Sequence, residues 1–128
     1  MKRIAIFASI FIAGFSASSA IAAERQDTIP EQFQGTWAVS ASDCDRGTLA
    51  ESILTIDPTQ LEFYASDSQM IAAAVDGDTE LALILESSGE GETWLSTAQF
   101  QLSADGQELT HIILRGFDEF TRVRCSPN

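Results

Sequence analysis

The chain has 128 residues, enough for one domain with a single hydrophobic core, and a formal net charge of −12. Its 19 acidic residues outnumber seven basic ones, and this excess repels the phosphates of nucleic acids and anionic lipid surfaces. We therefore expect no nucleic-acid partner, and a charged protein partner, if there is one, should be cationic.

Residues 1–22 have the parts of a secretory signal peptide. Two basic residues precede an apolar stretch over 4–15, and Ala20 and Ala22 fit the small-x-small cleavage pattern. The alternative is an uncleaved membrane anchor, because the apolar stretch approaches spanning length. The end rich in Ala and Ser favours cleavage, so we expect a periplasmic or secreted protein that begins near Ala23 and has no membrane span.

Cleavage would leave five basic residues, all Arg, against 19 acidic ones, a formal net charge of −14. The polar lead over 23–31 shows no periodicity, so we expect it to be flexible. The rest of the chain, 32–128, is predicted to form one β domain, which we expect to be a monomer.

From residue 32 onward the chain alternates in short runs separated by turn signals. We place eight strands in these runs, at 33–41, 52–57, 60–66, 69–75, 80–86, 92–103, 107–115 and 117–125. Three consecutive alanines at 72–74 are also compatible with a short helix, but we favour a strand. The segment 43–47 is predicted to be a loop, and 87–91 a Gly-rich turn.

Short links between the strands favour an all-β antiparallel meander, and eight meandering strands expose two edges unless they close into a barrel. Closure would bring the first strand beside the last. Cys44 follows the first strand and Cys125 ends the last, and an even pair in an exported domain is typical of a disulfide. The predicted disulfide and the predicted closure therefore support each other.

Phe33-Gln34-Gly35-Thr36-Trp37 is the most specific local pattern. Its glycine lets another backbone approach closely, and the tryptophan can plug one end of a barrel. The pattern resembles the F-x-G-x-W opening strand of lipocalin-like (calycin) barrels. That resemblance implies a basic residue of a late strand stacked over Trp37, and Arg122 or Arg124 would match. The alternative is a structural Trp in an unrelated small β domain.

Two further segments, 63–66 and 88–94, resemble segments that recur in exported bacterial proteins, but they indicate no activity. A barrel of eight strands has room for packed side chains or for one small ligand. The residues that we expect to line such a site are the large apolar ones on the inward sides of their strands. These are Trp37, Phe63, Leu83, Trp94 and Phe100. The alternative is that they simply fill the core.

Catalysis has little support in the sequence. His111 is the only histidine, and the spacing indicates no partner acid and no nucleophile elbow. A disulfide would leave no free thiol. One histidine and no free cysteine argue against zinc, whereas Asp76-Gly77-Asp78-Thr79-Glu80 has some likeness to a calcium loop but reads first as a tight turn. We therefore expect no catalytic residue, no metal and no cofactor.

These observations favour a non-catalytic binding module of the cell envelope, for a small apolar ligand or an envelope protein. The alternative is an inhibitor of an exported or host enzyme. The chain resembles small metalloprotease inhibitors in size, export and its Gly-x-Trp strand, and 23–28 would be the inhibitory trunk. Lysozyme, which is cationic, is the other inhibitor target that the acidic charge favours.

Overall fold

The computed structural model describes residues 14, 23–116 and 118–126, so the predicted signal peptide lies outside the described residues apart from Gly14. Within these ranges, no helix combines the length and the apolar character needed to cross a bilayer.

Nine strands and three short helical segments make up the described chain. The strands are β1 (Glu24–Gln26), β2 (Gly35–Ala38), β3 (Leu54–Ile56), β4 (Gln60–Phe63), β5 (Asp67–Asp76), β6 (Glu80–Gly89), β7 (Glu92–Leu102), β8 (Glu108–Leu114) and β9 (Asp118–Arg124). The helical segments are η1 (Glu31–Phe33), α1 (Ala41–Arg46) and η2 (Gly47–Leu49).

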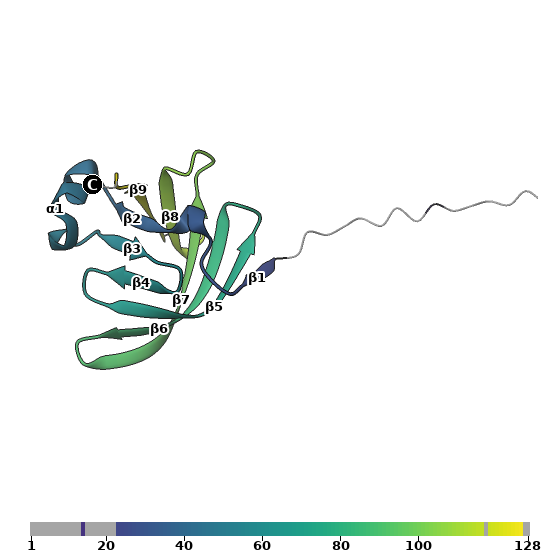
Figure 1. Cartoon of the computed structure of the whole chain (residues 1–128), viewed down its shortest axis with the longest axis horizontal. Helices are drawn as coiled ribbons and strands as arrows, with labels where there is room; N and C mark the ends of the chain where they lie inside the picture. Colours follow the sequence, from purple (N-terminus) through teal and green to yellow (C-terminus); the bar gives the residue numbers. More distant parts are fainter. Residues whose placement is uncertain (1–13, 15–22, 117, 127–128) are drawn as a thin grey trace, which may run out of the picture.

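The strands β2 to β9 form a closed antiparallel meander barrel of eight strands, to which β1 is added (Figure 1). Each strand pairs with the next along the chain, and β2 closes the ring by pairing with β9 through Trp37↔Arg124 and Ala38↔Val123. The predicted fold class is therefore confirmed. The strand at residues 72–74 is confirmed as well, because these alanines lie in β5.

The predicted disulfide joins Cys44 to Cys125, with the Cα atoms 5.4 Å apart. Both cysteines pack against a small cluster formed by Ala38, Ala50 and Ile53, separate from the main core. Ala38 pairs with Val123 across the closing ladder, so the disulfide fastens α1 over the contact between the first and last barrel strands. The two ends of the barrel sequence thus lie side by side.

Residues 43–46 lie in α1 and Gly47 begins η2, so the predicted loop is wrong, and the first strand covers Gly35–Ala38 instead of 33–41. Ser40 begins α1 by accepting a hydrogen bond from the Asp43 N–H at 3.2 Å. Six helical residues are too few to display an amphipathic period, so only the Ser cap marked this helix in the sequence.

The lead over 23–31, expected to be flexible, contains a strand. β1 pairs with β5 through Glu24↔Val75 to Gln26↔Ala73, and Ile29 is fully buried in the core. The reason is a difference in strand length: β4 covers only the stretch of β5 from Asp67 to Gln69, which leaves the rest of that edge for β1.

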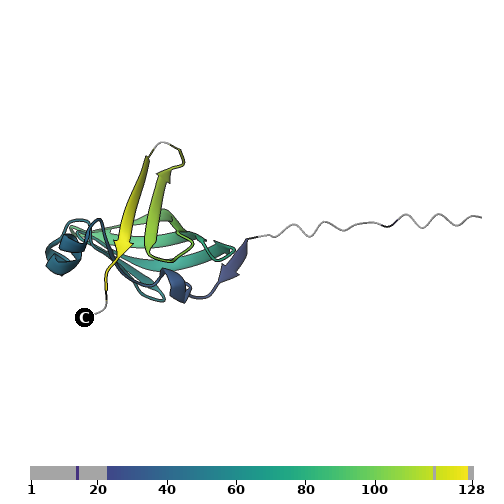
Figure 2. The ribbon, with the colours of Figure 1, turned by 90° about the horizontal axis from the view of Figure 1, so that it is seen from above.

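The β8–β9 hairpin leaves the barrel wall and stands away from the other strands (Figure 2). β7 pairs with β6 over ten residue pairs, from Gly89↔Glu92 to Glu80↔Gln101, but with β8 only from Gln99↔Ile112 to Leu102↔Leu109. Where this second ladder stops, the register between β8 and β9 shifts near Ile112. The seam between β7 and β8 is therefore open over the first half of β7.

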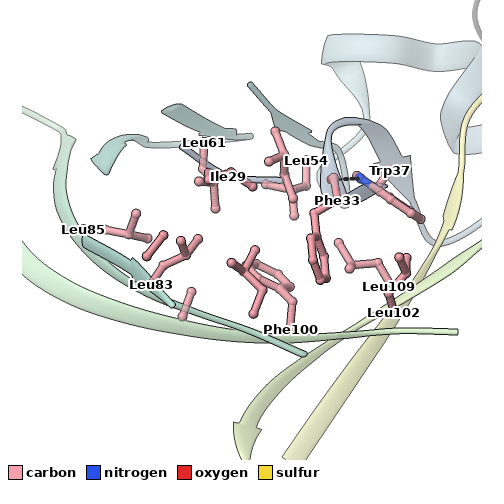
Figure 3. Packing of buried hydrophobic residues seen from close by; sticks show 14 of the residues in the cluster. Ile29, Phe33, Trp37, Leu54, Leu61, Leu83, Leu85, Phe100, Leu102 and Leu109 are labelled. Carbon is pink, nitrogen blue, oxygen red and sulfur yellow. Dashed lines mark hydrogen bonds between the residues drawn. The ribbon is translucent and has the colours of Figure 1, made fainter. Parts of the chain in front are cut away.

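One main core fills the barrel (Figure 3). Its largest fully buried side chains come from η1, β2 and the facing strands, and they include Phe33, Trp37, Leu54, Leu61, Leu81, Phe100 and Leu109.

Candidate functional site at the open end of the barrel

The two ends of the barrel differ in how their interior is filled. We call the end that holds Phe33, Trp37 and Arg124 the closed end. The opposite end, where Ser68, Ser87 and Ser96 point inward, is called the open end. The closed end is described first because it shows what a fully satisfied end of this barrel looks like.

At the closed end, Trp37 is fully buried and donates its Nε1–H to the Phe33 carbonyl at 3.1 Å. The arginine that covers it is Arg124, whose guanidinium carbon lies 4.1 Å from the centre of the Trp37 ring. Gly35 has φ +121°, and a Cβ there would lie 3.1 Å from Arg124 Nη1. The Phe-x-Gly-x-Trp pattern thus supplies the plug and the space for the arginine.

Arg124 also donates to three backbone carbonyls. Its Nε bonds Gly106 at 3.0 Å, its Nη1 bonds Gln34 at 2.8 Å and its Nη2 bonds Gln32 at 2.7 Å. Burial lowers the pKa of Arg124 below its ordinary value. Each of the three guanidinium nitrogens donates to a backbone carbonyl, so Arg124 is held in place over Trp37 by the protein itself.

At the open end, the inward side chains become small and polar. Along β6, the inward series Leu81, Leu83 and Leu85 is followed by Ser87. Its hydroxyl oxygen lies 2.7 Å from Ser68 Oγ on β5 and 2.7 Å from Ser96 Oγ on β7. Serine is much smaller than leucine, so these three neighbouring positions leave part of the barrel unfilled.

A hollow of about 500 Å³ lies beside these serines. Aromatic rings from two strand ends line it: Phe63 ends β4, Tyr64 follows it, and Trp94 is on β7. Tyr64 and Trp94 are 53% and 43% exposed, so their rings form a rim that solvent reaches. The hollow combines aromatic faces with hydroxyl groups, the mixture expected of a small-molecule site.

His111 lies at the same hollow, with its ring centre 4.7 Å from that of Phe100 and 6.4 Å from that of Phe63. Its pKa is lowered below the ordinary 6.5, first by burial and then by the positive charge of Arg122, against a smaller opposing effect of Asp118. The imidazole is therefore neutral near pH 7. Among the described residues, no side chain forms a hydrogen bond with the imidazole, and the serine hydroxyls at this hollow bond one another.

Arg122 is only 7% exposed, and its positive charge is near enough to His111 to lower the pKa of that ring. Its Nε donates to the Ser52 carbonyl at 2.7 Å, and its guanidinium carbon lies 4.6 Å from the centre of the Phe120 ring. Its Nη1 is buried and has no hydrogen-bond partner among the described residues. Burial lowers the pKa of Arg122 to about 10.

The five candidate lining residues separate into two groups. Phe63 and Trp94 line the hollow at the open end. Trp37, Leu83 and Phe100 are buried side chains of the main core. The serines and Tyr64 were missed by sequence reasoning, which placed Ser87 in a turn. That turn is confined to Glu90 and Gly91, both with positive φ, so β6 continues to Gly89 and carries Ser87 inward.

The acidic segment 76–80 connects β5 to β6 as a tight turn, with Asp76 paired to Glu80 across it. In the described part of the chain, no three His, Cys, Asp or Glu side chains gather in an arrangement that could hold a metal ion.

Comparisons with protein-family models, with curated proteins and with solved structures find no match for this chain.

Proposed function

We propose that this protein is a non-catalytic binding module of the cell envelope that holds a small, mainly apolar molecule in the open end of its barrel. One observation carries the proposal: the inward residues Ser68, Ser87 and Ser96 replace the large apolar side chains that fill the rest of the interior. Serines in place of packed leucines reduce the apolar surface that the barrel buries. A ligand that fills the hollow would bury apolar surface there again.

The lining suggests the chemistry of the ligand. Phe63 and Trp94 offer ring faces to a flat or branched apolar body, and the serine hydroxyls can donate to or accept from one polar group. A volume of about 500 Å³ lies within the usual range for small-molecule sites.

We further propose that the chain belongs with the lipocalin-like barrels and acts in the periplasm or outside the cell. The stacking of Arg124 on Trp37, two residues after Gly35, supports the family proposal. The disulfide supports an oxidising compartment. Mass spectrometry of the protein purified from the periplasm tests this part, and a mature chain beginning near Ala23 is the expected result.

The inhibitor alternative gains less support. A metalloprotease-inhibiting trunk over 23–28 would have to leave its place, because Glu24, Arg25 and Gln26 pair with β5. The acidic charge alone supports a cationic enzyme such as lysozyme as the target.

The test of the proposal uses N-phenyl-1-naphthylamine, a neutral apolar fluorophore. Ser96→Leu would fill the hollow while leaving the Ser68–Ser87 hydrogen bond in place, and we expect it to weaken binding of the fluorophore at least about tenfold. Ser88→Leu is the matched control, because Ser88 is an exposed neighbour of the inward Ser87. Circular dichroism checks that both variants fold. Equal binding by Ser96→Leu and the wild type would refute the site.

A further inference from the structure

The first half of β7 has an unpaired edge. Leu102 N–H donates to Thr79 on the β6 side, and Ser103 N–H donates to Glu108 on the β8 side. Backbone groups alternate along a strand, so odd-numbered residues of β7 direct N–H and C=O toward β8. The ladder with β8 stops at Gln99.

Three residues therefore present free backbone groups at this edge. They are Thr93, Leu95 and Thr97, and no strand among residues 23–116 and 118–126 pairs with them on that side. Natural proteins usually protect such edges with Lys, Pro or a bulge. The segment 92–98, Glu-Thr-Trp-Leu-Ser-Thr-Ala, has neither Lys nor Pro, and its register with β6 is continuous.

An apolar groove lies on the outer side of the same edge. It has a volume of about 960 Å³, and residues of β5, β6, β7 and β8 line it. Its walls include Ala82 and Ile84 on β6 and Ile113 on β8. No Asp or Glu lines the groove, although the chain has 19 of them. The lack of acidic side chains in this groove, on a protein that is otherwise so acidic, favours a surface that a binding partner covers.

The edge lies between this outer groove and the hollow at the open end. Thr97, Ala98 and His111 line both. Successive side chains of a strand point to opposite faces of a sheet. A strand added along Thr93–Thr97 would therefore direct alternate side chains into the groove and into the open end.

We propose that the free edge of β7 binds an extended segment of another protein by strand addition, with small apolar side chains in the outer groove and polar side chains toward the serine hydroxyls of the open end. The free N–H and C=O groups of Thr93, Leu95 and Thr97 supply the main-chain hydrogen bonds. The outer groove and the hollow at the open end determine which side chains the bound segment can carry. The formal net charge of −12 favours a partner segment of net positive charge. Two copies of this chain would repel each other, so a different protein is the better partner.

Amide hydrogen exchange with a short synthetic peptide that alternates valine with lysine and serine tests the proposal. Strand addition slows exchange at Thr93, Leu95 and Thr97 by at least about tenfold, while the amides of Trp94 and Ser96, which face β6, change little. The control is the same peptide with alternate backbone nitrogens methylated, which keeps the side chains but removes the donors. Uniform protection, no protection, or equal binding of both peptides would overturn the proposal.

A pair of variants separates backbone pairing from side-chain contact. Leu95→Pro removes an edge N–H without touching the ladder to β6, whereas Leu95→Ala keeps that N–H and removes most of the side chain. We expect the proline to abolish peptide binding and the alanine to weaken it less. Equal losses would overturn strand addition, and thermal melts identify a variant that has failed to fold. The exchange pattern of the wild type decides the question independently of either variant. Concentration-dependent protection without peptide, with a dimer in sedimentation, would assign the edge to a second copy instead.

Discussion

Arg122 and Arg124 lie two residues apart on β9, both stack on an aromatic ring, and their surroundings are opposite. Arg124 covers Trp37 and donates from all three of its nitrogens to backbone carbonyls. Arg122 covers Phe120, makes one hydrogen bond and leaves Nη1 buried without a partner among the described residues. Arginine thus has all three of its nitrogens hydrogen-bonded at position 124, whereas at position 122 one nitrogen lacks a partner.

This difference separates structural from functional demands within one small barrel. At the closed end, Arg124 and Trp37 form hydrogen bonds within the protein, and the side chains of Phe33 and Trp37 fill the interior. The open end keeps serine hydroxyls and the neutral His111 at a hollow, and the buried Arg122 has no partner for its Nη1 among the described residues. The inward serines satisfy one another but leave a hollow that large apolar side chains fill elsewhere in the barrel, and this difference is why we place ligand binding at the open end.

The largest expected effect comes from breaking the closure of the barrel. Replacing Cys44 and Cys125 together by Ser removes a link between residues 81 positions apart. We expect a loss of about 4–5 kcal/mol in the free energy of unfolding, because the unfolded chain regains the entropy of a long loop. Urea unfolding measures it, and a loss below about 1 kcal/mol would show that the β2–β9 ladder closes the barrel unaided.

Replacing each of the two arginines is expected to change the free energy of unfolding by an intermediate amount, and the two changes can be compared directly. Arg124→Met leaves the carbonyls of Gln32, Gln34 and Gly106 without their donor and should cost about 2–3 kcal/mol. Arg122→Met removes a buried charge that makes one hydrogen bond, so its effect should stay within about 1 kcal/mol of zero. Denaturant titration of both variants checks this, and equal losses would contradict the contrast between the two ends.

The smallest effect concerns pH. The pKa of His111 in the folded protein lies below 6.5, its ordinary value, so the unfolded state binds more protons between these two values. His111 therefore lowers stability as the pH falls from 6.5 through the folded pKa, and it has no effect above 6.5. His111→Gln should show a shallower decline of stability over that window, because glutamine takes up no proton there. Parallel pH profiles of stability in the variant and the wild type would contradict the burial of this ring.

The sequence by itself determined the strand-rich class, the number of barrel strands, the disulfide and the plug at Trp37. Each of these follows from a local pattern: alternation with a period of two, turn residues, an even pair of cysteines, and five consecutive residues around Gly35. It did not reveal α1, which is too short to show a period, or β1, whose pairing depends on the unequal lengths of β4 and β5.

Tertiary structure alone decided which arginine covers Trp37, because the register of β9 against β2 places Arg124 opposite that ring and moves Arg122 toward Ser52. The same holds for the hollow and the free edge. Ser68 and Ser96 are far apart in the chain and meet at Ser87 only through two separate ladders. Pairing register and closure are properties of the whole ring of strands, so no local stretch of sequence carries them.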